Sequence, residues 1–319
     1  MPFFYQYEKE ITEKLREMGA EVYLIDANVH ARSLWDKLIC FYTKKLKKIL
    51  LRAYYDKACR DIPADLDLVV VIKGPFLDKA LIGHLRQRFP QAVFADYQWD
   101  STGVFPEQLA LAEAFDRVLT FDPVDAAQYG WQYCPTYYRP EETDPDGKPQ
   151  YDLVFICSMH TRRLEILRQL KALARKKDLK LLSYIYVPRL QYFLEARIRR
   201  NPLYRRFGSD MHTVSLPPAE ICRLYRQSRC IVDYTFAAQQ GYSMRTLDSL
   251  HHRCKLLTNN AYVRNADFYR PENIFVYDEK RLVLPEQFLE TPYAPLPEEI
   301  LRKYSLEGFL QRLFAEQCR

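Results

Sequence analysis

The sequence predicts a two-domain α/β protein in which each half is a Rossmann-like unit. The chain has 319 residues, about twice the length of a typical domain, so each half can bury a core of its own. Apolar patterns typical of strands and of helices alternate through most of the sequence, as in a parallel sheet covered by helices. A polar segment at 139–150, RPEETDPDGKPQ, interrupts this alternation and is typical of a linker.

The first domain is expected at 1–138. Its clearest strand is 67–72, because a continuous apolar run of this length suits a strand buried on both faces. The other expected elements are strands at 21–25, 92–95 and 117–120, helices at 8–18, 77–89 and 106–115, and a helical turn at 125–129. Since few residues precede the first helix, either the domain lacks its first strand or the true start lies upstream.

The second domain is expected at 151–319, where the alternation begins again. Its expected elements are strands at 151–156, 179–186, 230–233, 255–258 and 274–277, and helices at 163–177, 218–226, 245–251 and 306–317. Parallel sheets bind ligands at the carboxyl ends of their strands. Two such domains facing each other across a cleft therefore make the cleft the expected site.

The composition is that of an ordinary globular protein, with 48% hydrophobic and 28% charged residues. No apolar run approaches the roughly 18 residues needed to span a bilayer, and the N-terminus lacks the features of a signal peptide. We therefore expect a cytoplasmic protein. The eight cysteines are scattered without metal-ligand spacing, so no metal site or other cofactor is expected.

The net charge of +6 comes from local basic segments at 44–48, 175–177 and 197–206. They are either solvated helix faces or attract anionic groups, on a lipid surface or a phosphate-bearing substrate. Nucleic acid is not expected, because no recognised binding motif accompanies the charge. The basic, aromatic segment 33–60 either rests on the inner face of the cytoplasmic membrane or is a core-packing helix with a solvated basic side.

Polar and aromatic clusters follow several predicted strands. In the first domain these candidates are Lys73, Tyr97, Trp99 and Asp100. A cluster at the carboxyl end of a strand favours a functional role, although Trp99 also suits a capping aromatic residue and Asp100 a helix N-cap.

In the second domain, the loop 157–163 precedes a helix whose N-terminus favours a phosphate, and Ser158, His160 and Arg163 lie in it. The loop has no glycine and is not a P-loop; a basic helix start that faces water is the alternative.

The segment 239–248, QQGYSMRTLD, lies between a strand and a helix. Gly241 permits a positive φ or a close backbone approach, and Arg245 at the helix start is suited to a diphosphate. Asp248 lies about one turn later on the same face, where a carboxylate can accept hydrogen bonds from the two hydroxyls of a ribose. The alternative is an arrangement of caps and salt bridges.

The strings Gln240-Gly241…Met244–Leu250, Lys255–Asn260 and Asp267-Phe268-Tyr269 resemble bacterial GT-B glycosyltransferase-like proteins of capsule and lipopolysaccharide gene clusters. The resemblance extends over nearly the whole chain and includes Tyr7-Glu8 and Tyr97–Ser101. It implies that the second domain holds a nucleotide-sugar donor and the first an acceptor, to which Tyr7, Lys73, Tyr97 and Trp99 are assigned. Many such enzymes bind the donor through two acidic residues eight apart; here these positions are Gln240 and Asp248, so the first carboxylate is absent.

The resulting hypothesis is a glycosyltransferase that acts on a polysaccharide or lipid-linked glycan. Arg245, His160 or Arg163 and helix N-termini would neutralise the donor diphosphate without a metal, and Asp100 or Glu8 would be the base if the reaction inverts. The alternative is a catalytically inactive binding module with the same fold. Gln240, the missing first strand and Cys157, at a position where the family usually has glycine, favour that alternative.

Overall fold

A computed structural model describes residues 1, 6–27, 44–74, 76–139 and 149–314, with the side chains of 44–47 left out. The chain divides into two units, Met1–Cys134 together with Leu310–Arg319, and Pro135–Phe309, and each is described by itself. Residues 33–43 of the proposed membrane segment, most of the predicted linker and the end of the predicted C-terminal helix lie outside the described residues.

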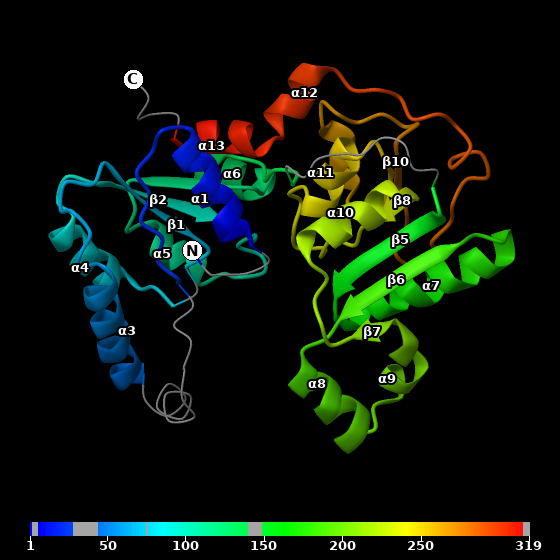
Figure 1. Cartoon of the computed structure of the whole chain (residues 1–319), viewed down its shortest axis with the longest axis horizontal. Helices are drawn as coiled ribbons and strands as arrows, with labels where there is room; N and C mark the ends of the chain where they lie inside the picture. Colours follow the sequence, from blue (N-terminus) through cyan, green and yellow to red (C-terminus); the bar gives the residue numbers. More distant parts are fainter. Residues whose placement is uncertain (2–5, 28–43, 75, 140–148, 315–319) are drawn as a thin grey trace. The chain divides into compact units, whose positions relative to one another are not determined.

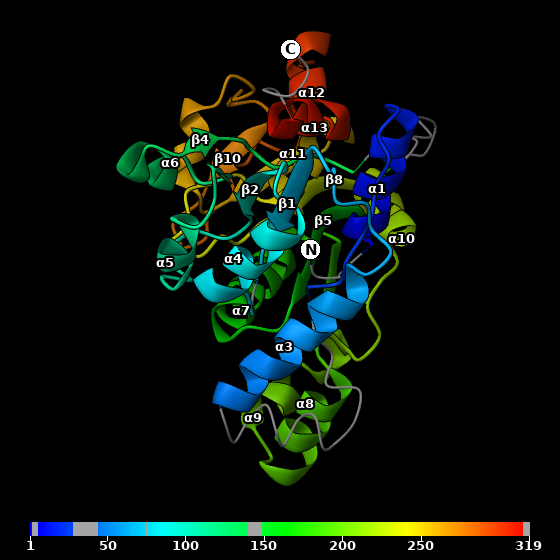
Figure 2. The ribbon, with the colours of Figure 1, turned by 90° about the vertical axis from the view of Figure 1, so that its left-hand side faces the viewer.

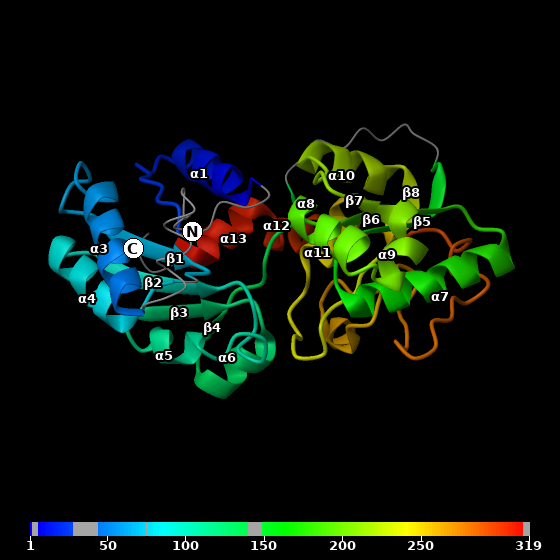
Figure 3. The ribbon, with the colours of Figure 1, turned by 90° about the horizontal axis from the view of Figure 1, so that it is seen from below.

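Unit 1 contains a four-stranded parallel sheet in the order β1-β2-β3-β4. Its strands are β1 (Leu68–Ile72), β2 (Val93–Gln98), β3 (Arg117–Thr120) and β4 (Gln132–Tyr133), and its helices are α1 (Tyr7–Glu17), α3 (Lys44–Ala58), α4 (Lys79–Arg88), α5 (Gln108–Ala112) and α6 (Pro123–Tyr129). Figure 3 shows α1 and α13 (Leu306–Phe314) on the side of β1, and α5 and α6 on the side of β4.

The helices of unit 1 begin where the sequence supplies a cap. Asp78 accepts a hydrogen bond from the Leu81 N–H at 2.9 Å and starts α4, and Asp122 caps α6 through the Val124 N–H at 2.9 Å. Helices α3 and α4 run side by side (Figure 2), and one apolar cluster joins them to the sheet through Leu51, Ile82 and Phe94 among others. The alternation predicted for this half is therefore confirmed.

The strand predicted at 21–25 is wrong. This segment contains no strand, and Ile25 pairs instead with the chain start: its carbonyl accepts a hydrogen bond from the N-terminal ammonium of Met1 at 3.1 Å. Tyr23 and Leu24 are exposed, so the apolar pattern does not correspond to a buried face. Among the described residues, no strand of unit 1 precedes α1.

Unit 2 contains a six-stranded, wholly parallel sheet in the order β10-β9-β8-β5-β6-β7. Its strands are β5 (Tyr151–Ser158), β6 (Leu181–Tyr186), β7 (Met211–His212), β8 (Ser228–Val232), β9 (Lys255–Thr258) and β10 (Ile274–Val276). The chain runs outward from β5 to β7 and then returns to the other side of β5 for β8. The strand order therefore reverses between β5 and β8.

Helices cover both faces of this second sheet. They are α7 (Thr161–Lys177), α8 (Arg189–Phe193), η1 (Leu194–Ile198), α9 (Pro202–Arg206), η2 (Gly208–Asp210), α10 (Pro218–Arg226), α11 (Met244–His251), η3 (Ala261–Asn265) and α12 (Glu298–Lys303). One apolar cluster joins α7 to Phe155 and the other joins α10 and α11 to Ile156, consecutive residues that point to opposite faces of β5. Figure 1 shows α7 on one side of the sheet and α10 and α11 on the other.

The division of the chain differs from the predicted boundaries at two places. It falls after Cys134, ahead of the predicted end of the first domain, and the segment from Leu310 onward groups with unit 1 instead of the second domain. The division thus falls within α13, on which Leu306, Phe309, Leu310 and Leu313 are all buried. Among the described residues, none of the helices has the length and apolar content needed to span a bilayer.

Candidate functional site

The reversal of strand order in unit 2 defines where its site lies. Strands β5 and β8 are adjacent and parallel, with Leu153 opposite Cys230. After β5 the chain continues to β6 on one side of this pair, and after β8 it continues to β9 on the other side. Such a reversal opens a crevice beyond the carboxyl ends of the strands, where Rossmann-like sheets bind their ligands. The loops that follow Ser158 of β5 and Val232 of β8 meet at this point.

Asp233, the residue directly after β8, is the anchor of the site. Its side chain is completely buried, and its Oδ2 accepts hydrogen bonds from the hydroxyls of Thr235 at 3.0 Å and Thr258 at 3.3 Å. Its Oδ1 accepts a bond from the Nε of Arg245 at 2.6 Å. Sequence reasoning treated Asp233 only as the end of a strand; its position at a carboxyl end was the signal that could have identified it.

For Arg245 the sequence left open a diphosphate ligand or a salt bridge, and in the structure it forms an ion pair with Asp233. It lies in the first turn of α11, which Ser243 caps by accepting the Thr246 N–H at 3.2 Å. Burial disfavours the charged guanidinium, but Asp233 outweighs this effect and the pKa of Arg245 is raised. About a fifth of the side chain is exposed, so part of the guanidinium reaches the surface while its charge is neutralised.

Arg163 differs from Arg245, because its charge has no carboxylate partner in the described part of the chain. Its Nη1 donates to the Ser158 carbonyl at 3.1 Å, and its Cζ lies 5.2 Å from the centre of the Phe236 ring. Its Nε is buried and has no hydrogen-bond acceptor. Burial and then the neighbouring Arg245 lower the pKa of Arg163. A buried donor without an acceptor is a position where a water, an ion or a ligand can bind.

His160 caps α7 next to this arginine. Its Nδ1 accepts the Arg162 N–H at 3.3 Å, which assigns the proton of the neutral ring to Nε2. Its ring packs edge-on against Phe236 at 4.8 Å. Burial lowers the pKa of His160, followed by the charges of Arg163 and Arg162. The imidazole is therefore neutral at pH 7 and is a hydrogen-bond donor through Nε2.

The segment around Gly241 packs inward. The side-chain amide of Asn260 donates to the carbonyls of Gln240 at 3.1 Å and Gly241 at 3.2 Å, and the φ of Gly241 is not positive. Asp248 is only 4% exposed and accepts the backbone N–H of Arg139 at 3.1 Å; burial raises its pKa to about 6. In this geometry the carboxylate of Asp248 is turned inward, and its contact with ribose hydroxyls stays a prediction.

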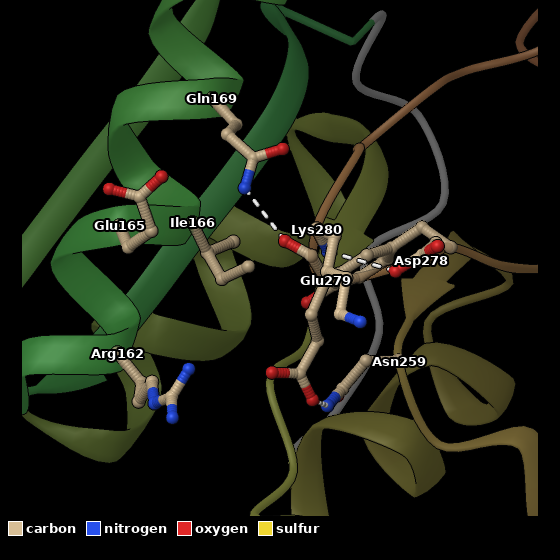
Figure 4. Close-up of a pocket in the computed structure, with 9 residues that line it drawn as sticks. Arg162, Glu165, Ile166, Gln169, Asn259, Asp278, Glu279 and Lys280 are labelled. Carbon is tan, nitrogen blue, oxygen red and sulfur yellow. Dashed lines mark hydrogen bonds between the residues drawn. The ribbon is translucent and has the colours of Figure 1, made fainter.

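A hollow of about 500 Å³ lies near the start of α7, between this helix and the ends of β9 and β10 (Figure 4). Gln169 fixes one wall, because it donates to the Glu279 carbonyl at 2.8 Å and accepts the Leu282 N–H at 2.8 Å. Asn259 fixes another by donating to Glu279 Oε1 at 2.5 Å. The exposed Arg162 faces the same hollow, which is therefore polar and carries both signs of charge.

The candidates of unit 1 also meet at the carboxyl ends of strands. Lys73 pairs with Asp100 at 2.5 Å, and its Nζ lies 5.4 Å from the Phe105 ring centre. The Trp99 ring lies 5.4 Å from that of Tyr7 and 5.8 Å from that of Tyr97. The structure thus brings together the four residues assigned to the acceptor and the proposed base.

Three of the unit 1 candidates are buried: Tyr7, which is 8% exposed, Glu8 and Tyr97. The hydroxyl of Tyr97 donates to the Cys134 carbonyl at 3.0 Å, and no part of the residue is exposed. Glu8, on α1, is 7% exposed. Sequence reasoning missed Asp96, which is 2% exposed on β2 and accepts a hydrogen bond from Gln98; burial raises its pKa to about 7. Among the described residues, no group of three or more His, Cys, Asp or Glu side chains is placed to hold a metal ion.

No protein-family model matches the sequence, and no curated protein does. Solved structures do match. TarM is 12% identical, with 83% of this chain covering 57% of TarM at a TM-score of 0.54. A UDP-N-acetylglucosamine 2-epimerase from Rickettsia bellii (12% identity, 99% and 87% covered, TM-score 0.48) and the lipopolysaccharide outer core galactosyltransferase WaaB (9%, 84% and 81%, 0.47) are more distant in structure. These likenesses concern the fold: two parallel-sheet α/β domains, whose solved neighbours are GT-B proteins, as the sequence predicted.

Proposed function

We propose that unit 2 binds the diphosphate of a nucleotide-sugar and that the protein is a glycosyltransferase of cell-surface polysaccharide synthesis. The observation that carries the proposal is Arg163, a half-buried cation at the reversal of strand order whose Nε has no acceptor among the described residues. A phosphate oxygen would supply the missing acceptor and the missing negative charge. The first turn of α7, which leaves backbone N–H groups unused within the helix, lies directly beside it.

In the proposed reaction, Arg163 and the Nε2–H of His160 stabilise the negative charge that develops on the leaving diphosphate. Protein cations would then take the place of a metal ion. Arg245 stays paired with Asp233 and would contact the diphosphate only through the exposed part of its guanidinium. The hollow beside Arg162 and Asn259 offers room for the rest of the donor.

Unit 1 would supply the acceptor site, with Trp99 as an apolar surface for a sugar ring and Asp100 as the base. Asp100 must leave Lys73 to accept a proton from the acceptor hydroxyl. The proposal places the reaction in the cytoplasm, on an acceptor carried by a polysaccharide or a lipid at the inner face of the membrane. Segment 33–60 would contact that membrane, and its Ile49 is 63% exposed.

A binding module without turnover is the second candidate. Two ion pairs favour it, because Lys73–Asp100 and Arg245–Asp233 neutralise the groups that the sequence assigned to catalysis and to the diphosphate. Turnover of a nucleotide-sugar separates the two candidates.

The first experiment measures the thermal unfolding midpoint with UDP, GDP, dTDP, CMP and ADP. We expect one nucleotide to stabilise the protein, by about 2.7 kcal/mol at a hundredfold excess over its Kd. Arg163→Met should abolish the shift. Arg168→Met, which removes an exposed arginine of the same helix, should retain it. No shift with any nucleotide, or an equal shift in Arg163→Met, would contradict the proposed site.

The second experiment measures turnover of the stabilising nucleotide's sugar conjugates. Asp100→Asn removes the proposed base and should lower kcat by about 100-fold or more while the nucleotide-induced shift persists. Glu107→Gln, a change on a nearby exposed carboxylate, is the control. Unchanged turnover in Asp100→Asn would remove this residue from the mechanism, and binding without turnover would favour the binding module.

A further inference from the structure

Residues 189–198 of unit 2 expose an apolar surface that the proposed reaction does not use. Helix α8 continues directly into the π-helical turn η1, and four large side chains on this stretch are exposed: Leu190 (70%), Phe193 (54%), Leu194 (37%) and Ile198 (61%). We call these four residues the apolar ridge. Figure 1 shows α8 beyond the edge strand β7.

The ridge lies on the side of the helix that faces away from the core of unit 2. Tyr192 and Ala196 are on the opposite side, where they pack against the cluster that contains Tyr204 and Phe207. The wide turn is closed by the Arg199 N–H, which donates to the Leu194 carbonyl five residues earlier at 2.8 Å. Such a turn rotates successive residues less than an α-helix does, so Ile198 stays in line with Leu190 and Leu194. π-Turns of this kind are frequent at functional positions.

Positive charge surrounds the ridge. Residues 189–206 contain six arginines and one acidic residue, Glu195. Glu195 accepts hydrogen bonds from Arg199 at 2.5 Å and Asn201 at 2.9 Å, so its charge is neutralised within the segment. Arg189, Arg197 and Arg200 are exposed next to the apolar side chains. An exposed apolar ridge with a basic border is typical of a helix that lies in the interface of an anionic bilayer.

We propose that the apolar ridge and its arginines dock unit 2 on an anionic lipid surface. Exposed Leu, Phe and Ile side chains would enter the boundary between headgroups and acyl chains, which removes their apolar area from water. The arginines would contact the lipid phosphates. The ridge belongs to unit 2, whereas the segment 33–60 belongs to unit 1, and the lipid proposal does not depend on the proposed sugar transfer.

The test is flotation of the full chain with phosphatidylcholine vesicles, with and without phosphatidylglycerol. We expect strong binding only when phosphatidylglycerol is present, and weaker binding at high salt. Phe193→Ser/Ile198→Ser should weaken binding about 20-fold or more. Arg197→Gln/Arg200→Gln should weaken it about 30-fold, since each basic residue near such a surface contributes about 1 kcal/mol.

Two matched variants serve as controls in the same unit: Val283→Ser, which removes another exposed aliphatic side chain, and Arg302→Gln, which removes another exposed arginine. Both should bind like the unchanged protein. All variants should keep the unfolding midpoint, because the altered side chains are exposed. A third pair of changes, Lys48→Gln/Ile49→Ser on α3, tests the segment 33–60 separately.

The proposal is overturned if the unchanged protein does not float with phosphatidylglycerol vesicles. It is also overturned if the ridge and arginine variants bind as tightly as their controls, or if only the α3 variant loses binding. Self-association that the ridge variant abolishes, without vesicle binding, would assign the ridge to a second copy of the chain and overturn the lipid proposal.

Discussion

The two units differ in the sign of a charge that is left without an ion pair. Each holds one ion pair at the carboxyl ends of its strands, Lys73–Asp100 in unit 1 and Arg245–Asp233 in unit 2. Among the groups of low exposure that have no ion pair within the described residues, one in each unit is opposite in sign to the other. In unit 1 this group is the carboxyl of Asp96, whose pKa is raised to about 7, and in unit 2 it is the guanidinium of Arg163, whose pKa is lowered.

The difference lies in what each group can do. Asp96 is 2% exposed and accepts a hydrogen bond from Gln98, so protonation relieves its charge without a ligand. Arg163 does not lose its proton near neutral pH, since its ordinary pKa is far higher. A bound anion would balance its charge. We therefore interpret the guanidinium of Arg163 as a position for an anionic ligand. The buried carboxyl of Asp96 should instead make the stability of the fold depend on pH.

The largest effect on stability is expected when the ion pair between Arg245 and Asp233 of unit 2 is broken. Asp233→Asn leaves Arg245 without its carboxylate, and removal of one partner from a buried pair costs about 3 to 5 kcal/mol of unfolding free energy. Glu298→Gln, which breaks the exposed pair with Arg302, should cost less than about 1 kcal/mol. Urea unfolding of the two variants measures both. A similar small loss in both would mean that Arg245 finds another partner.

The next effect should appear as a pH dependence in unit 1. Because the pKa of Asp96 rises from 3.8 to about 7 on folding, its favourable contribution is complete below about pH 4 and is lost as the pH rises through 7. Asp96→Asn removes this loss. The variant should therefore gain stability relative to the unchanged protein between pH 4 and 8, by at most roughly 4 kcal/mol.

Asp61→Asn, at an exposed position of the same unit, is the control for this titration. Its stability should follow that of the unchanged protein at every pH. If the stability of Asp96→Asn had the same pH dependence as that of the unchanged protein, Asp96 would be ionised in the folded state. Its burial would then be compensated by a group other than Gln98.

The sequence predicted most of the fold because its strands are continuous apolar runs. The strands at 117–120 and 255–258 and the helix at 218–226 have the predicted bounds. The strand at 21–25 failed because alternation of apolar residues does not reveal whether a neighbouring strand exists to pair with it. The short elements β4, β7 and α8 were missed because two to five residues give too little periodicity for a prediction.

The sequence predicts where the candidate site lies, but not which of its charged residues form ion pairs. Strand ends identified Lys73, Asp100, His160 and Arg163 from the sequence alone. Which carboxylate neutralises which cation depends on contacts between distant residues. Arg245 and Asp233 are brought together by the loop between β8 and α11, so the sequence could not show that Arg245 is matched and Arg163 is not.

The smallest effect separates the role of Arg163 in binding from any role in folding. Arg163→Met removes a buried donor without an acceptor and keeps a long apolar side chain, so the protein should gain about 1 kcal/mol of stability in the absence of ligand. Arg168→Met should leave the stability nearly unchanged, because its pair with Glu165 is exposed. Urea unfolding without nucleotide measures the difference. A loss of stability in Arg163→Met would mean that its contacts with Ser158 and Phe236 outweigh the unmatched charge, and the case for an anion at this position would then rest on nucleotide binding alone.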